Sequence, residues 1–150
     1  MMMAQNARID KVQDLMELMI EMTRYVERAI REGTPIHEVE GEVWQRVLQM
    51  GNLALRQFLA GQGTGDLGET LTTPEGRTLK RLKDLHPRSY QSIFGEFAIE
   101  RTVYGTREGQ KIDAVPLDAR LQLPESEFSY LLQEWAQTLG VQHAFAATAE

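Results

Sequence analysis

The sequence predicts an α+β chain: a long antiparallel helical hairpin, then a small antiparallel β module, then a C-terminal helix–turn–helix-like pair. Three observations predict this fold class. Apolar residues recur at helical spacing through residues 9–60, the only long run with a period near two lies at residues 89–124, and helical spacing returns after Pro124. The predicted boundaries of the three parts are residues 1–61, 62–124 and 125–150.

The first helix is predicted over residues 9–31 and carries two apolar stripes. One stripe alternates in steps of three and four residues, which is the heptad spacing of a coiled-coil seam. This seam comprises Ile9, Val12, Met16, Met19, Val26 and Ile30, with Thr23 filling one position. The second stripe comprises Leu15, Leu18, Met22, Tyr25 and Ala29. A helix that is apolar over so wide an arc needs partners on more than one side.

A tight connection at Gly33, Thr34 and Pro35 separates this helix from a second one, predicted over residues 35–60. Glycine suits the position after a helix, threonine an N-cap and proline the first helical turn. The apolar stripes of the second helix are Val43, Val47, Met50 and Ala54, and Trp44, Leu48, Leu55 and Leu59. The two antiparallel helices make half of a four-helix bundle, which either a second copy in a homodimer or the rest of the chain completes.

Three glycines after the second helix, Gly63, Gly65 and Gly68, match the dinucleotide-binding pattern G-x-G-x-x-G. That pattern needs a strand before it and a helix after it, so that phosphate meets the helix N-terminus. Here a helix precedes the glycines and a short strand follows them. We therefore interpret the segment as a helix stop and a flexible loop.

Around the turn Pro74-Glu75-Gly76, residues 69–73 and 77–82 are predicted to form two short strands, or one strand and a turn of helix. Residues 77–111 carry 8 Lys or Arg and 4 Asp or Glu, a balance of +4 in a chain of net charge −6. Phosphate binding requires such concentrated positive charge. The candidate DNA-binding residues are Arg77, Lys80, Arg81, Lys83, Arg88, Arg101, Arg107 and Lys111. The alternative is a scattered set of solvated charges.

The central strand of the β module is predicted over residues 97–104. Its two faces are Phe97, Ile99 and Val103 on one side, and Glu100 and Thr102 on the other. Gly105 and Gly109 bracket a polar turn, and residues 112–116 are predicted to return as a strand.

After Pro124 the pattern predicts two helices. Ser126 is the expected N-cap of the first. Its apolar face comprises Phe128, Leu131, Leu132 and Trp135. Gly140 is expected to end this helix, and another is expected to begin near Gln142.

Residues able to carry catalysis or a metal are widely separated along the chain. There is no cysteine, which excludes disulfides, thiolate-bound zinc and a cysteine nucleophile. The available carboxylates and histidines are Asp66, Asp84, Asp113, Asp118, His37, His86 and His143. We interpret them as solvated turn residues and ordinary surface side chains, with no catalytic or metal site. No apolar run is long enough to span a membrane, and we expect the chain in the cytoplasm.

Three stretches carry a family resemblance: GQGTGDLGETLTTPEGRTLKRL, HPRSYQSIFGEFAIERTVYGTREGQKIDAVPLDARLQLP and SEFSYLLQEWAQTLGVQHAFA. They contain IFGEF, RTVYG, PLD, LQLP and YLLQ-W-LGV in this order. From about Val43 onward the chain resembles the N-terminal part of the ISKra-type insertion-sequence transposases. The resemblance implies a later catalytic domain of ribonuclease-H-like fold, beyond residue 150. Three acidic residues of that domain bind divalent metal and drive DNA strand transfer.

Related members often place C-x-x-C pairs in the β module and form a zinc-ribbon-like unit. This chain has YGTRE at the corresponding turn, residues 104–108, and no cysteine, so the zinc does not carry over. Structural zinc supplies much of the stability of small modules. Packing of Phe94, Phe97, Tyr104 and Val115 is therefore expected to replace it.

Together with the apolar helices, the resemblance implies the N-terminal region of a transposase involved in DNA transposition. We expect this region to bind transposon-end DNA and not to be an enzyme by itself. A homodimer through the N-terminal helices is one of the two alternatives that the apolar helices leave open. No cofactor is expected in this chain, and divalent metal is expected only in the catalytic domain. The alternative hypothesis is a non-catalytic structural or interaction module, the remnant of a truncated transposase, that only dimerises.

Overall fold

The computed structural model describes residues 2–106 and 112–148, with side chains described over residues 13–106 and 112–140. Long helices and small antiparallel sheets occur in the same chain, which confirms the predicted α+β class. The chain divides into two compact units, Met1–Gly61 and Gln62–Glu150. Within the described residues, no helix has an apolar stretch long enough to cross a membrane.

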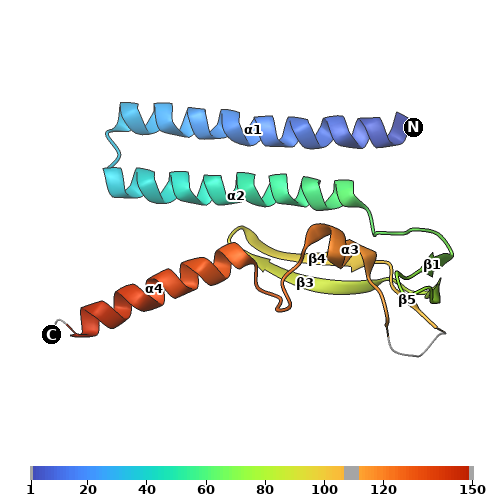
Figure 1. The fold of residues 1–150 in the computed structure, drawn as a ribbon. Coiled ribbons are helices and arrows are strands. Elements are labelled where there is room, and N and C mark those ends of the chain that lie inside the picture. The colour runs from blue at the N-terminus through green and yellow to red at the C-terminus, as the bar shows by residue number, and fades with distance from the viewer. Residues whose placement is uncertain (1, 107–111, 149–150) are drawn as a thin grey trace. The chain divides into compact units, whose positions relative to one another are not determined.

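The N-terminal unit is the predicted helical hairpin (Figure 1). Helix α1 spans Met2–Glu32 and α2 spans Ile36–Gln62. Gly33 adopts a positive φ of 64°, which a glycine accommodates without strain from a side chain. The Thr34 N–H donates to the Ala29 carbonyl at 3.1 Å, and the Val39 N–H donates to the Pro35 carbonyl at 3.2 Å. These bonds close one helix and start the next, so the two helices run side by side and antiparallel.

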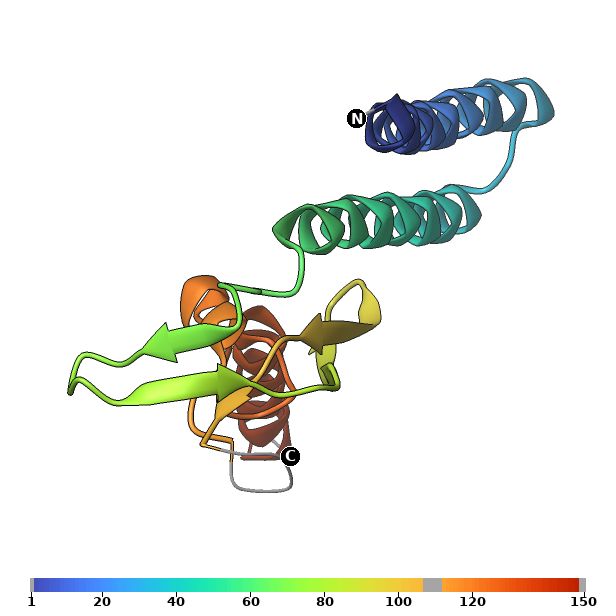
Figure 2. The same ribbon diagram turned by 90° about the vertical axis from the view of Figure 1, so that its right-hand side faces the viewer.

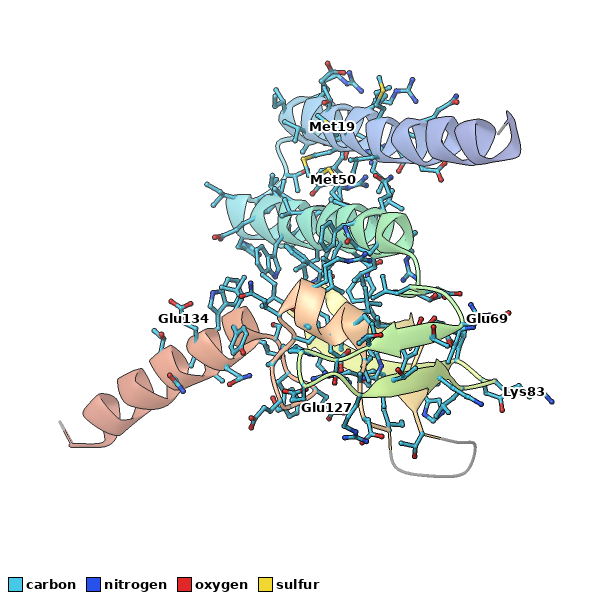
Figure 3. The ribbon with its side chains drawn as sticks, turned by 45° about the vertical axis from the view of Figure 1, so that its right-hand side comes forward. Met19, Met50, Glu69, Lys83, Glu127 and Glu134 are labelled. Carbon is cyan, nitrogen blue, oxygen red and sulfur yellow. The ribbon has the colours of Figure 1, made fainter. Side chains whose placement is uncertain are left out.

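The two apolar stripes of α1 have different surroundings. Residues of the second stripe, such as Met22 and Tyr25, are half-buried, and Ala29 is buried. Residues of the heptad seam remain exposed, with 57% of Met16 accessible and 75% of Ile30. The half-buried Met50 of α2 lies between the two helices (Figure 3). The hairpin therefore packs through the second stripe and leaves most of the heptad seam open.

Two small antiparallel sheets form the β module of the second unit (Figure 2). Strands β1 (Thr70–Thr72), β2 (Thr78–Arg81) and β5 (Tyr104–Gly105) make one sheet in the order β1-β2-β5. Strands β3 (His86–Ser92) and β4 (Gly95–Arg101) make the other, a ribbon. The first two strands flank the predicted turn, so the strand interpretation of residues 77–82 is the correct one of the two.

The core of this unit is small and apolar. Its buried side chains are Leu79, Leu82, Phe97, Ile99, Val103, Tyr104 and Leu117. The expected contributions of Phe97 and Tyr104 to packing are confirmed, whereas Phe94 and Val115 are only half-buried.

One prediction for the central strand is wrong. Strand β4 ends at Arg101, and Thr102 is buried instead of lying on the outer face. The Thr102 N–H donates to the Thr64 carbonyl at 2.8 Å, and the two hydroxyls lie 2.8 Å apart. Hydrogen bonds to Thr64, in the segment after α2, thus take the place of strand pairing at Thr102. They also satisfy the buried polar groups of Thr102.

The predicted returning strand at residues 112–116 is also wrong. Only Ala114 forms a β-bridge, with Tyr104, and Pro116 opens helix α3 (Pro116–Leu121). Proline suits the first helical turn because its missing N–H is not needed there. The polar turn expected up to Gly109 lies largely outside the described residues, since positions 107–111 are among those not described.

In place of the helix–turn–helix-like pair predicted after Pro124, the described residues 125–148 hold a single helix. Helix α4 runs from Tyr130 to Thr148 without a break at Gly140. Its cap is Ser129, whose Oγ accepts a hydrogen bond from the Leu132 N–H at 3.0 Å. Ser126 lies in the preceding bend. The Gln91 N–H donates to the Glu127 carbonyl at 2.8 Å, which ties the start of this segment to β3.

Candidate nucleic-acid interface

Arg88 and Arg101, two of the predicted DNA-binding residues, lie inside the second unit. Both guanidinium groups donate to Oδ2 of Asp118 on α3, at 3.3 Å from Arg88 and 2.7 Å from Arg101. Arg88 also donates to the carbonyls of Pro124 and Ser126. At 18% and 15% side-chain exposure, these cations are mostly enclosed. They hold α3 and the following loop on the ribbon.

The register of the β3–β4 ribbon explains this cluster. Arg88 pairs with Ile99, and Arg101 follows Ile99 by two residues, so the two arginines are diagonal neighbours on one face. The positive charges of the two neighbouring guanidinium groups repel each other, and the negative charge of the Asp118 carboxylate offsets that repulsion. Its other oxygen, Oδ1, is buried and accepts no hydrogen bond within the described part of the chain.

Arg81 holds the glycine loop that follows α2. Its Nη1 donates to both carboxylate oxygens of Asp66, at 2.9 and 2.8 Å. The Gly68 N–H donates to Oδ1 of the same carboxylate at 2.9 Å. The Tyr104 hydroxyl accepts from the Leu67 N–H and donates to the Gly68 carbonyl. The loop is therefore pinned at several points, which differs from the flexible loop predicted for it.

The glycines of this loop have backbone roles. Gly63, Gly65 and Gly68 all have positive φ angles, a region that favours glycine. Gly65 is buried, and a Cβ built on it would lie 2.9 Å from the backbone nitrogen of Leu117. The absence of a side chain at Gly65 thus allows the backbone of the loop to lie close to α3. The loop therefore needs these glycines for turning and for packing against α3.

The hydrogen bonds of the Asp66 carboxylate lead us to expect that the free energy of unfolding depends on pH. The hydrogen bond from the Gly68 N–H, followed by the one from Arg81, holds the pKa of Asp66 below its ordinary value of 3.8. A lowered folded-state pKa means that this contribution is fully present above the ordinary pKa and is lost as pH falls through the lowered one. We expect Asp66→Asn to be less stable than the native chain at neutral pH.

That difference is expected to shrink as the solution is acidified toward about pH 2. Denaturant unfolding of both chains across this range, at constant ionic strength, measures it. A stability difference that stays constant down to the lowest pH would contradict the role assigned to the Asp66 carboxylate.

The remaining predicted cations that the structure describes gather along β2. Lys80 lies on the strand with its side chain exposed, and the exposed Lys83 projects away from the β module in Figure 3. Arg77 is 58% exposed, and its Nη2 lies 3.7 Å from Oδ2 of Asp113. Arg81 is partly exposed beside Asp66. Arg107 and Lys111 lie outside the described residues.

Three hydroxyl side chains accompany these cations and were not among the predicted site residues. Thr70 pairs with Lys80 across the β1–β2 ladder, and Thr72 pairs with Thr78. All four side chains are exposed, whereas Leu79, the residue between Thr78 and Lys80, is buried. The alternation in TLT and TLKR is the sequence signal for this face, but only the pairing register brings the two strands' hydroxyls together.

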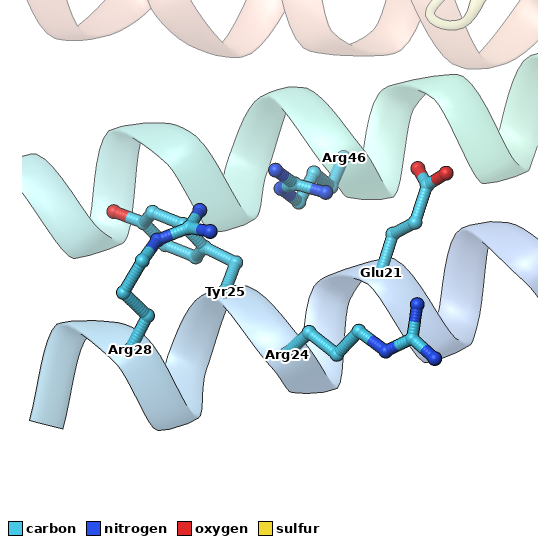
Figure 4. Close-up of a pocket in the computed structure, with 5 residues that line it drawn as sticks. All are labelled: Glu21, Arg24, Tyr25, Arg28 and Arg46. Atoms are coloured by element: carbon cyan, nitrogen blue, oxygen red, sulfur yellow. The ribbon is translucent and has the colours of Figure 1, made fainter.

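A second cationic site lies on the helical hairpin (Figure 4). A shallow pocket there is lined by Glu21, Arg24, Tyr25, Arg28 and Arg46. The guanidinium carbons of Arg28 and Arg46 lie 5.8 and 5.1 Å from the centre of the Tyr25 ring. These distances fit cation–π contacts, and the contact from Arg46 joins α2 to α1 across the hairpin. Arg46 also pairs with Glu42 at 3.1 Å, so part of this charge is compensated.

Carboxylates and histidines are not gathered into a metal site in the part of the chain that the structure describes. Asp66, Asp113 and Asp118 each face an arginine, and Asp84 is exposed. His86 begins β3 and His37 lies near the start of α2, in different units. The side chain of His143 is outside the described residues.

The candidate interface is the exposed segment around β2, which we call the β2 basic strip. It comprises Arg77, Lys80, Arg81 and Lys83, flanked by Thr70, Thr72 and Thr78. Comparison of the chain with protein-family models, with curated proteins and with solved structures found no match.

Proposed function

We propose that this chain is the DNA-binding and self-association region of an ISKra-type insertion-sequence transposase and takes part in DNA transposition in the cytoplasm. Support comes from the motif resemblance and from the placement of cations around β2. In this proposal the chain is not catalytic by itself. Divalent metal acts in a separate catalytic domain.

The observation that carries the DNA-binding proposal is the β2 basic strip. Four cations lie within seven residues, and three threonine side chains share one face of the small sheet with Lys80. Lysine, arginine and threonine side chains are common donors to phosphate oxygens, and such contacts position a protein on a duplex without reading its sequence. The ion pairs of Arg77 and Arg81 are exposed and therefore weak, so phosphate competes for these guanidinium groups.

Charge reversal on the strip tests the proposal. We expect Lys80→Glu combined with Lys83→Glu to weaken binding to duplex DNA at least about tenfold, because two phosphate contacts become repulsive. The slope of log affinity against log salt should fall in magnitude by about 2, one unit for each lost contact. Fluorescence anisotropy with a labelled duplex across a salt series measures both quantities.

A matched control distinguishes the effect of the β2 basic strip on DNA affinity from the effect of the chain's net charge. Arg31→Glu with Arg56→Glu makes the same change in total charge, but on the helical hairpin. This control should leave the salt slope close to that of the native chain. If the two double variants lose equal affinity, the strip has no special role and the DNA-binding proposal for it fails.

A second candidate function is self-association without DNA binding, favoured by the exposed apolar side chains of α1. Met16, Met19 and Ile30 are each more than half exposed on a long helix. Apolar surface of this kind marks interaction sites. A native chain that forms dimers but shows no salt-dependent affinity for duplex DNA would favour this second function.

A further inference from the structure

The shallow pocket on the helical hairpin holds more positive charge than its own carboxylates neutralise (Figure 4). Its lining includes three arginines, Arg24, Arg28 and Arg46, and a single carboxylate, that of Glu21. Arg46 pairs with Glu42 beside the pocket at 3.1 Å. Among the side chains that the structure describes, neither Arg24 nor Arg28 forms an ion pair. Three cations therefore face two carboxylates, and positive charge remains available to a ligand.

The Tyr25 ring positions two of these cations. The guanidinium carbons of Arg28 and Arg46 lie 5.8 and 5.1 Å from its centre, and the Arg46 side chain is only 22% exposed. Because the ring and the Glu42 carboxylate already hold the Arg46 guanidinium, less side-chain freedom is lost when an anion binds. The two cations at one ring also repel each other, and an anion bound next to both offsets that repulsion.

These side chains favour a phosphate group as the ligand. A guanidinium group presents paired N–H donors that match the oxygens of phosphate or carboxylate. Since Arg24 and Arg28 are exposed, a carboxylate paired with one of them gains little. A phosphate group has several charged oxygens and engages more than one arginine at once. The pocket volume of about 180 Å³ is below the roughly 300–1,000 Å³ of sites for drug-sized ligands, which suits one such group.

We propose that the pocket lined by Arg24, Arg28 and Arg46 binds a phosphate group. The group comes from a free phosphate anion or from a nucleic-acid backbone, because both present charged phosphate oxygens. The pocket belongs to the unit Met1–Gly61, whereas the β2 basic strip belongs to the other unit. The proposal is therefore independent of DNA binding by the strip.

Titration of the full-length chain with inorganic phosphate tests the site. The arginine Nε–H signals are followed by NMR, with chloride keeping the ionic strength constant. We expect saturable shifts with a dissociation constant on the order of 1 mM, because the pocket is exposed to solvent. Arg24→Gln combined with Arg28→Gln should weaken phosphate binding at least about tenfold, measured on the remaining Arg46 signal, since two charge-assisted bonds are lost.

Arg31→Gln combined with Arg56→Gln is the matched control. It removes the same charge from the helical hairpin, but neither residue lines the pocket. This control should keep the native affinity for phosphate. Glutamine is a good helix former, and circular dichroism checks that the helices persist in both double variants. Equal losses of phosphate affinity in the two double variants would overturn the proposal, because net charge alone would then explain the binding.

Tyr25 allows a test that leaves every charge in place. Tyr25→Phe keeps the aromatic ring and should bind phosphate as the native chain does. Tyr25→Leu removes the ring that positions Arg28 and Arg46, and should weaken phosphate binding about two- to fivefold. Equal phosphate affinities in these two variants would contradict the role assigned to the ring.

Binding of duplex DNA to the same variants identifies the source of the phosphate. If the Arg24 and Arg28 double variant loses affinity for inorganic phosphate alone, the ligand is a free phosphate anion. If its duplex affinity falls by more than that of the control, the pocket holds a backbone phosphate. The proposal is overturned if the double variant keeps the native response to inorganic phosphate and the native duplex affinity. The β2 strip variants test DNA binding by the strip separately.

Discussion

Gly65→Ala is expected to lower the free energy of unfolding of the second unit by about 2–5 kcal/mol. The left-handed backbone, with φ of 77°, costs a residue with a Cβ about 1–2 kcal/mol. The new Cβ would also lie 2.9 Å from both the nitrogen and the Cβ of Leu117, and such overpacking costs about 1–3 kcal/mol. Native-state hydrogen exchange of the Leu82 amide, which bonds to the Val103 carbonyl, measures the loss.

Gly63→Ala is the matched control for this prediction. Gly63 has a similar φ of 69°, but a Cβ there would meet nothing within 4 Å. The control should therefore lose only the backbone cost of about 1–2 kcal/mol. Equal losses in the two variants would show that the contact between Gly65 and Leu117 contributes nothing.

Asp118→Ala is expected to lower the free energy of unfolding by roughly 2–3 kcal/mol. The change leaves Arg88 and Arg101 next to each other without their shared carboxylate. Breaking a fully buried ion pair costs about 3–5 kcal/mol, and the remaining 15–27% exposure of these side chains reduces that figure. Because the arginines are tied to α3 through this residue, hydrogen exchange should also rise in residues 116–121.

Asp113→Ala tests whether any ion pair of this unit would give the same result. Its partner Arg77 is 58% exposed and the two charges are 3.7 Å apart, so its removal should cost less than about 1 kcal/mol. The proposed roles require a clear difference between the two alanine variants. A loss at Asp113 as large as that at Asp118 would contradict the structural assignment of the Arg88–Arg101 cluster.

Local chemistry made the helical hairpin and the first two strands predictable. The steps of three and four residues in α1, the Gly33-Thr34-Pro35 connection and the Pro74-Glu75-Gly76 turn each act over a few residues. Predictions failed where a distant segment decided the outcome. Thr102 is buried because Thr64, far away in sequence, bonds to it.

The candidate site shows the same limit. Sequence located the positive charge within residues 77–111, but it gave no means of sorting those cations. The β3–β4 register turned Arg88 and Arg101 toward Asp118, and Arg81 found Asp66 across the glycine loop. A count of charged residues along the sequence treats every charged side chain as exposed to solvent. Ion pairs within the fold make that assumption invalid for the residues that form them.

By itself, the sequence determined the α+β class, the long hairpin and the two stripes of α1, because these follow from periodicity along a single element. Only the tertiary structure decided which stripe faces α2, which cations remain around β2 and why Gly65 must be a glycine. Those properties depend on pairs of residues that are distant in the chain and meet only through strand register and helix packing. The open heptad seam and the β2 basic strip are the two surfaces that result.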